Sequence, residues 1–79
     1  METTEIKEKI SDALVSVLGH SNFETNDELT AQDVDGWDSL SHMMIITKIE
    51  EQFDIKFKLR DLNKLKNLGS LVSVIQGKI

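Results

Sequence analysis

Residues 33–40, with the sequence DVDGWDSL, concentrate the side chains of this chain that could take part in chemistry. The acids Asp33, Asp35 and Asp38 suggest first a calcium-binding loop, which needs glycine at its sixth position and an acid at its twelfth. In a loop that starts at Asp33, those positions hold Asp38 and Met44. The spacing therefore argues against calcium, and we expect no metal site.

A serine nucleophile is the second possibility, because Ser39 and His42 lie three residues apart and would be neighbours on one helix face. The Gly-x-Ser-x-Gly spacing of a nucleophile elbow is missing, and no strand pattern precedes the serine. A chain of 79 residues also has too small a core to build a deep catalytic cavity easily. We therefore expect a protein that is not an enzyme and has no catalytic residues.

The third possibility is that Ser39 is an acceptor that another enzyme modifies. A helix that begins after Asp38 places Ser39 in its first turn, where unpaired N–H groups and the positive end of the helix dipole favour a phosphate diester. Asp38 is suited to be the N-cap of this helix. Gly36 lets the chain bend into the turn, and the long preceding loop is expected to leave the serine hydroxyl accessible.

The first part of the chain predicts one helix followed by a long connection. Apolar residues at three- and four-residue spacing indicate an amphipathic helix over residues 4–18, with Thr3 or Thr4 as its cap and Gly19 as its left-handed end. Residues 19–38 exceed the usual loop length, which favours an ordered, functional loop. The residues expected to pin it to the core are Phe23, Leu29, Val34 and Trp37.

Three further helices are expected after this loop. One begins after Asp38 and ends near Phe53, a short one lies within residues 60–66, and a last one is capped by Asn67 and ends near Gly77. Residues 54–58 alternate apolar and charged side chains, but no second alternating segment exists to pair with them as a strand. The chain thus predicts an all-α four-helix bundle with three longer helices, one short third helix and a long first loop.

The second helix has more apolar surface than a small core can absorb. The side expected to face the core carries Ile45, Ile46, Ile49 and Phe53. Leu40, Met43 and Met44 extend the apolar surface around the helix, so we expect them to contact a partner. His42 lies beside the core stripe, where its ring could hydrogen-bond to the long loop.

Composition limits the classes of protein further. The chain has no cysteine and a formal charge of −5, with an acidic segment of net charge −8 over residues 24–54 and a basic one of +5 over residues 55–79. This balance argues against nucleic acid and favours basic protein partners for the acidic segment. The N-terminus has no signal-like apolar run, and the apolar stretches are too short for a membrane span. We expect one domain over residues 1–79 that is a cytoplasmic monomer.

The motif around Ser39 resembles a known family. GWDSLSH over residues 36–42, followed by IEEQFDIKF over residues 49–57, is similar to the phosphopantetheine-dependent acyl carrier proteins, and the similarity extends over essentially the whole chain. The resemblance implies that Ser39 carries a 4′-phosphopantetheine arm, installed from coenzyme A by a phosphopantetheinyl transferase. The thiol of the arm would hold acyl groups as thioesters for acyl-loading and acyl-processing enzymes. It also implies that Asp38 helps to dock the transferase, and we count Asp35 among the partner contacts.

The sequence departs from carriers of housekeeping fatty acid synthesis, which usually have acids early in the second helix. Ser41 and Met44 stand at such positions, and the short third helix is surrounded by basic residues. The GWDSL form is similar to stand-alone carriers of specialised fatty acid or polyketide pathways, and equally to aminoacyl or peptidyl carriers of nonribosomal peptide and surface-polymer systems. An unmodified helical interaction module is the alternative of another class. An apolar groove between the second and third helices would favour long acyl chains.

Overall fold

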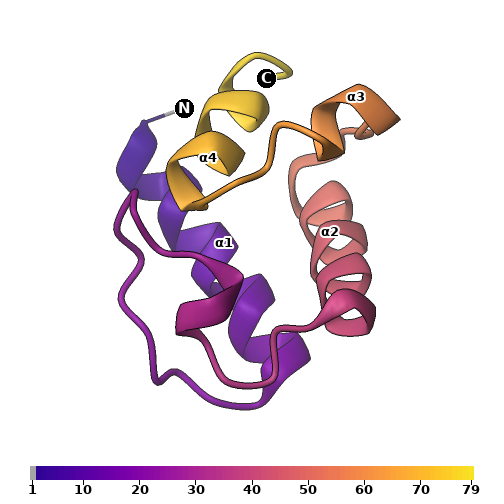
Figure 1. Ribbon diagram of the computed structural model, residues 1–79. Helices are drawn as coiled ribbons and strands as arrows, with labels where there is room; N and C mark the ends of the chain where they lie inside the picture. The colour runs from indigo at the N-terminus through magenta and orange to yellow at the C-terminus, as the bar shows by residue number, and fades with distance from the viewer. Residues whose placement is uncertain (1) are drawn as a thin grey trace.

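The computed structural model describes residues 2–79, and all regular secondary structure in that span is helical, as predicted (Figure 1). The elements in chain order are α1 (Thr3–Leu18), the 3-10 turn η1 (Ala31–Asp33), α2 (Ser39–Phe53), α3 (Leu59–Leu62) and α4 (Leu68–Gln76). None of the helices between residues 2 and 79 combines the length and the hydropathy that crossing a bilayer requires.

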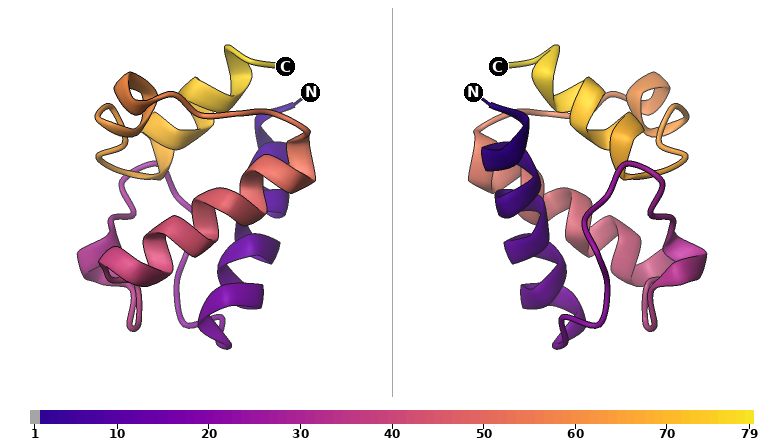
Figure 2. Two further views of the ribbon diagram at one scale, coloured as in Figure 1. Left: turned by 90° about the vertical axis from the view of Figure 1, so that its right-hand side faces the viewer. Right: turned by 90° about the vertical axis from the view of Figure 1, so that its left-hand side faces the viewer.

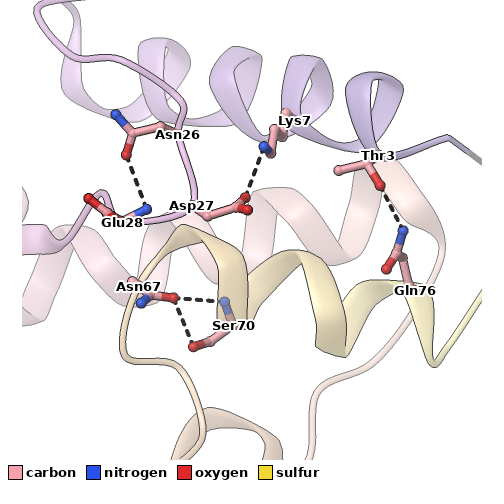
Figure 3. Close-up of polar contacts among 8 residues, drawn as sticks. All are labelled: Thr3, Lys7, Asn26, Asp27, Glu28, Asn67, Ser70 and Gln76. Atoms are coloured by element: carbon pink, nitrogen blue, oxygen red, sulfur yellow. Dashed lines mark hydrogen bonds and ion pairs between the residues drawn. The ribbon is translucent and has the colours of Figure 1, made fainter.

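Helix α1 starts one residue earlier than predicted, and the prediction that Thr3 or Thr4 caps it is wrong. Glu2 occupies the N-cap position, and its side chain makes no capping hydrogen bond. The Thr3 hydroxyl instead accepts a hydrogen bond of 3.1 Å from Nε2 of Gln76, which joins the start of α1 to the end of α4 (Figure 3). The predicted end of α1 is confirmed, since Gly19 is left-handed with a φ of 79°.

The core lies where α1, α2 and α4 meet. Helices α1 and α2 run in roughly opposite directions and cross obliquely, and α4 lies across the end of the molecule where α1 begins and α2 ends (Figures 1 and 2). The stripes predicted for the helices are buried as expected. Together with three loop residues they form one cluster: Ile6, Ile10, Ala13, Leu14, Leu29, Val34, Ile45, Ile46, Ile49, Phe53, Ile55, Leu68, Leu71, Val72 and Ile75.

The loop between α1 and α2 is ordered by apolar anchors and by backbone hydrogen bonds. Leu29 and Val34 are buried, and Phe23 and Trp37 pack against the core while half-buried, so all four predicted anchors are confirmed. The carbonyl oxygen of Leu29 also accepts a hydrogen bond of 2.8 Å from the N–H of Leu68, the first residue of α4.

A second tether of the loop lies at Asp27, two residues before Leu29. The carboxylate of Asp27 forms an ion pair of 2.9 Å with Nζ of Lys7 in α1 (Figure 3). The carbonyl oxygen of Asp27 accepts a hydrogen bond of 3.0 Å from the N–H of Gly69 in α4. The loop is thus bound to two helices that are distant in the sequence.

The connection after α2 is extended, as predicted, and residues 54–58 form no strand. Its Phe57 N–H donates a hydrogen bond of 2.8 Å to the carboxylate of Glu50, which holds it against α2. The following helix α3 is shorter than the predicted range of residues 60–66, because it begins at Leu59 and ends at Leu62. Asp61 accounts for its position: the carboxylate accepts from the Lys58 N–H at 2.9 Å and pairs with Nζ of Lys78 at 2.8 Å.

Candidate functional site

The start of α2 is a tightly hydrogen-bonded turn. Asp38 is its N-cap, as predicted, and its carboxylate accepts a hydrogen bond of 2.9 Å from the N–H of Ser41. The Ser41 hydroxyl oxygen accepts in return from the Asp38 N–H at 2.8 Å, which completes a capping box. The hydrogen bond from the Ser41 N–H stabilises the ionised carboxylate and so lowers the pKa of Asp38.

Ser41 also fixes the chain that enters the helix. Its hydroxyl donates a hydrogen bond of 2.6 Å to the carbonyl oxygen of Gly36. Gly36 has a φ of 84°, a conformation that side chains with a Cβ rarely adopt, so the predicted bend requires glycine here. Sequence reasoning missed the part played by Ser41. The pattern of an N-cap acid with a hydroxyl residue three positions later could have indicated it.

Ser39 is the first residue of α2 and is exposed. Among residues 2–79 no group forms a hydrogen bond with its hydroxyl, although the neighbouring Asp38 and Ser41 are both engaged. The first turn of α2 presents backbone N–H groups and the positive end of the helix dipole at this point, so a phosphate attached to the Ser39 oxygen would be favourably placed. The geometry therefore fits a serine that accepts a phosphate-linked group.

The predicted contact of His42 with the long loop is confirmed, and its partner is Trp37. The indole Nε1–H donates a hydrogen bond of 3.0 Å to Nδ1 of His42, and the two rings stack with their centroids 6.0 Å apart. Both side chains are half-buried, and burial lowers the pKa of His42. The other histidine, His20, lies elsewhere in the loop and donates to the carbonyl oxygen of Asp35 at 2.7 Å.

The acids of residues 33–38 serve local turns. The carboxylate of Asp33 accepts from the backbone N–H and the hydroxyl of Thr30, whereas that of Asp38 accepts from Ser41. Asp35 is exposed. Within the described residues no three side chains of histidine, aspartate or glutamate converge as metal ligands would. These acids thus build and flank the turn at Ser39.

The surplus apolar face of α2 is exposed, as the helical pattern predicts. Leu40 keeps 75% of its surface accessible, Met43 50% and Met44 53%. They line a shallow groove of about 510 Å³ together with Thr47 and with residues near the end of α1. This groove lies between α1 and α2. A groove between the second and third helices, α2 and α3, would have favoured long acyl chains as the cargo.

Two further hollows adjoin Ser39 and the Trp37–His42 pair. A surface hollow of about 620 Å³ is lined by Ala31, Trp37, Asp38, Ser39, His42 and Met43. A smaller, partly open hollow of about 50 Å³ shares Ala31, Trp37 and His42 with it and is also lined by Leu29, Leu65 and Leu71.

Comparisons with known proteins agree with this site. Residues 8–75 match the sequence family described as "Phosphopantetheine attachment site". The chain is 36% identical over 69 residues to an acyl carrier protein of Streptococcus pneumoniae, which covers 87% of this chain and 89% of the relative. It is 30% identical over 78 residues to an acyl carrier protein of Chlorobium phaeobacteroides, covering 99% of this chain and 100% of the relative.

The fold is similar to a solved structure as well. The solution NMR structure of holo acyl carrier protein from Geobacter metallireducens superimposes with a TM-score of 0.84. The match covers 92% of this chain and 84% of that chain, at 36% sequence identity.

Proposed function

The chain belongs to the acyl carrier protein family, whose cofactor is a covalently attached 4′-phosphopantetheine, and we propose that Ser39 is the residue that holds this arm. The protein is a carrier and not a catalyst. The arm supplies a terminal thiol, which this cysteine-free chain lacks and which can hold an acyl group as a thioester. The chain itself supplies the attachment point and its surroundings.

The observation that carries this proposal is the exposed Ser39 hydroxyl at the head of α2. The hydrogen bonds of Asp38 and Ser41 hold the turn rigid, so the hydroxyl is presented in one position to a phosphopantetheinyl transferase. The N–H groups of the first turn stabilise the phosphate of the arm once it is attached.

We propose that partner enzymes dock on the surface around Ser39. Leu40, Met43 and Met44 supply exposed apolar area, and the carboxylates of Asp35 and Asp38 border it. Apolar area with a charged rim is typical of protein interfaces. The partners that fit are the transferase and the acyl-loading and acyl-processing enzymes, with basic side chains facing the two acids.

The pathway that we propose is a specialised one of the fatty acid or polyketide type. Two features support it. Ser41 is committed to the capping box and Met44 is exposed, so this part of α2 lacks the acids that housekeeping partners bind. The exposed side chains of Lys58, Arg60 and Lys64 also give the surface around α3 a positive charge.

Mass spectrometry tests the attachment site. Coexpression with a broad-specificity phosphopantetheinyl transferase should add a single phosphopantetheine to the wild type and none to Ser39→Ala. Ser73→Ala, which removes an exposed serine of α4, is the matched control and should be modified like the wild type.

Thermal unfolding of Ser39→Ala is the companion measurement. Its melting temperature should stay within about a degree of that of the wild-type apoprotein, because an exposed side chain without a hydrogen-bond partner contributes little to stability. If Ser39→Ala were still modified, or if no transferase modified the wild type, the assignment of Ser39 would be wrong.

A further inference from the structure

The four residues 34–37, which lead into α2, form a tight turn. The Trp37 N–H donates a hydrogen bond of 3.3 Å to the carbonyl oxygen of Val34, and Gly36 has a φ of 84°. Asp35 is not among the residues of the described span 2–79 that have a positive φ. A negative φ followed by a positive one, in a turn closed from its fourth residue to its first, defines a type II turn.

A type II turn differs from the commoner type I turn in the orientation of the peptide between its two central residues. Here that peptide joins Asp35 to Gly36. Glycine adopts positive and negative φ about equally well, so Gly36 permits both orientations. A contact from outside the turn can therefore decide between them.

His20 supplies such a contact from the other end of the loop. Its Nε2 donates a hydrogen bond of 2.7 Å to the carbonyl oxygen of Asp35, which belongs to this central peptide. Its Nδ1 accepts a hydrogen bond of 3.1 Å from the N–H of Asn22, so the ring proton is assigned to Nε2. In the type I orientation the Asp35 carbonyl would point away from His20, and their hydrogen bond would be lost.

The ring of His20 is itself held in place. It follows Gly19, the left-handed end of α1, and it is half-buried. It lies edge-on to Phe23 with the ring centroids 6.1 Å apart, and Phe23 packs against the core. The turn also lies against the end of α1, since a Cβ on Gly36 would be 3.6 Å from Cδ2 of Leu18. The end of α1 thus supports the turn that precedes α2.

The turn is anchored at two successive carbonyl groups. The carbonyl of Asp35 accepts from His20, and that of Gly36 accepts a hydrogen bond of 2.6 Å from the hydroxyl of Ser41. The side chain of Asp35 is exposed and is carried by the turn between these anchors. The direction of the Asp35 carboxylate relative to Ser39 therefore depends on both hydrogen bonds.

We propose that His20 is a positioning residue for the modification of Ser39, because its hydrogen bond fixes the turn that presents the Asp35 carboxylate to the phosphopantetheinyl transferase. This inference rests on the proposed attachment at Ser39 and on the proposed docking of partners at Asp35. His20 acts through the turn and not on the Ser39 hydroxyl. Loss of its hydrogen bond should weaken transferase binding without changing the transfer step, which means a higher KM for the apoprotein at constant kcat.

Two variants separate the hydrogen bond from the ring. His20→Phe keeps an aromatic ring beside Phe23 but loses the N–H donor, whereas His20→Gln loses the ring but keeps an N–H donor in place of Nε2. A broad-specificity phosphopantetheinyl transferase with coenzyme A modifies each protein at increasing apoprotein concentration, and intact mass gives the rates. For His20→Phe we expect KM to rise by about two- to fivefold, the effect of one exposed charge contact, at constant kcat. His20→Gln should stay close to the wild type.

A double-mutant cycle tests whether His20 acts through Asp35. Asp35→Asn should itself raise KM by a similar factor. His20→Phe should add little in that background, because the carboxylate that His20 positions is gone. Glu24→Gln, which removes an exposed acid of the same loop, is the control and should have the KM of the wild type.

NMR spectroscopy reports on the turn itself. In a type II turn the Hα of Asp35 lies close to the amide proton of Gly36, whereas in a type I turn the two amide protons lie close to each other. The wild type and His20→Gln should give the first nuclear Overhauser effect, and His20→Phe should give both.

The outcomes separate this inference from the proposed attachment site. A wild-type KM for His20→Phe or for Asp35→Asn would overturn the role of His20. So would a full further rise in KM when the two substitutions are combined, or a turn that stays purely type II in His20→Phe. The attachment is judged by intact mass alone: modification that is lost in Ser39→Ala supports Ser39 whatever the His20 variants show, and a wild type that no transferase modifies contradicts it.

Discussion

Within residues 2–79 nothing hydrogen-bonds to the Ser39 hydroxyl, while Asp38 and Ser41 on either side hold each other by reciprocal hydrogen bonds of 2.9 and 2.8 Å. This difference follows from position in the helix. The N-cap and third residues face each other across the first turn, whereas the first residue points outward. At the scale of single residues, the site is therefore an exposed serine between two neighbours that hydrogen-bond to each other.

His42 should make the stability of the protein depend on pH. Burial lowers its pKa below the ordinary value of 6.5, so the native state binds fewer protons than the unfolded state. The contribution of the neutral ring is fully present above pH 6.5 and is lost as the pH falls through the lowered pKa. Protonation would also place a proton on Nδ1, which could then no longer accept from Trp37.

We therefore expect the free energy of unfolding to decrease as the pH falls below 6.5, and we expect His42→Asn to lack this part of the decrease. Urea unfolding at several pH values measures this, because asparagine keeps an acceptor but does not titrate. The two proteins share their carboxylates, so the difference between their pH profiles isolates His42. Parallel profiles for the two proteins would show that His42 titrates in the folded protein as it does in the unfolded chain.

At the scale of elements, α2 combines two tasks. Its buried side, with Ile45 and Ile49 fully inaccessible, holds the helix on α1, and its opposite side exposes Leu40, Met43 and Met44, which we propose contact partners. The cap at the start of α2 has a further role, because the hydrogen bonds that begin the helix also position Ser39. A change in the cap should therefore affect both stability and modification.

Ser41→Ala tests this link. The variant loses the bonds of the hydroxyl to the Asp38 N–H and to the Gly36 carbonyl, so the free energy of unfolding should fall by about 1 kcal/mol. Modification of Ser39 should become slower, because the turn that presents it is less rigid. Urea unfolding and a time course of transferase modification measure the two effects. Ser73→Ala should change neither, and equal behaviour of the two variants would contradict a structural role for the Ser41 hydroxyl.

At the scale of the whole molecule, acidic and basic residues are separated along the chain. Residues 24–54 have a net charge of −8 and residues 55–79 one of +5. Partner enzymes that bind around Ser39, as we propose, would meet acids from the loop and, near α3, exposed basic residues. Enzymes that bind carriers through acids of the second helix find Met44 at one such position, so the charge pattern selects among partners.

Housekeeping enzymes of fatty acid elongation should accordingly act on this carrier with a lower kcat/KM than on a housekeeping carrier. Met44→Glu should raise that kcat/KM by about two- to fivefold, the effect of one surface charge pair of up to about 1 kcal/mol. Met44→Gln, of similar size without the charge, is the control and should not raise it. Equal use of the wild type and of a housekeeping carrier would refute the specialised pathway.

Much of the fold could be predicted because its signals are local. The period of apolar residues indicated the helices, and Asp38, Asn67 and Gly19 marked ends that the structure confirms. The same period predicted the exposed face of α2, because Leu40, Met43 and Met44 remained after the other apolar residues of the helix had been assigned to the core. Ser39 was singled out by its neighbours in the chain and by the resemblance they carry.

The contacts that the sequence could not predict join residues far apart in the chain or depend on volume. Thr3 binds Gln76 instead of capping α1, and Asp61 binds Lys78, which helps to place α3. Whether Trp37 meets His42, and what volume the hollow beside them has, depends on how the loop, α2 and α4 pack together. The hydrogen-bonding capacity of a residue and the helical period of apolar residues can be read from the sequence. Cavities and contacts between distant residues depend on tertiary packing, which selects one among many arrangements of similar local energy.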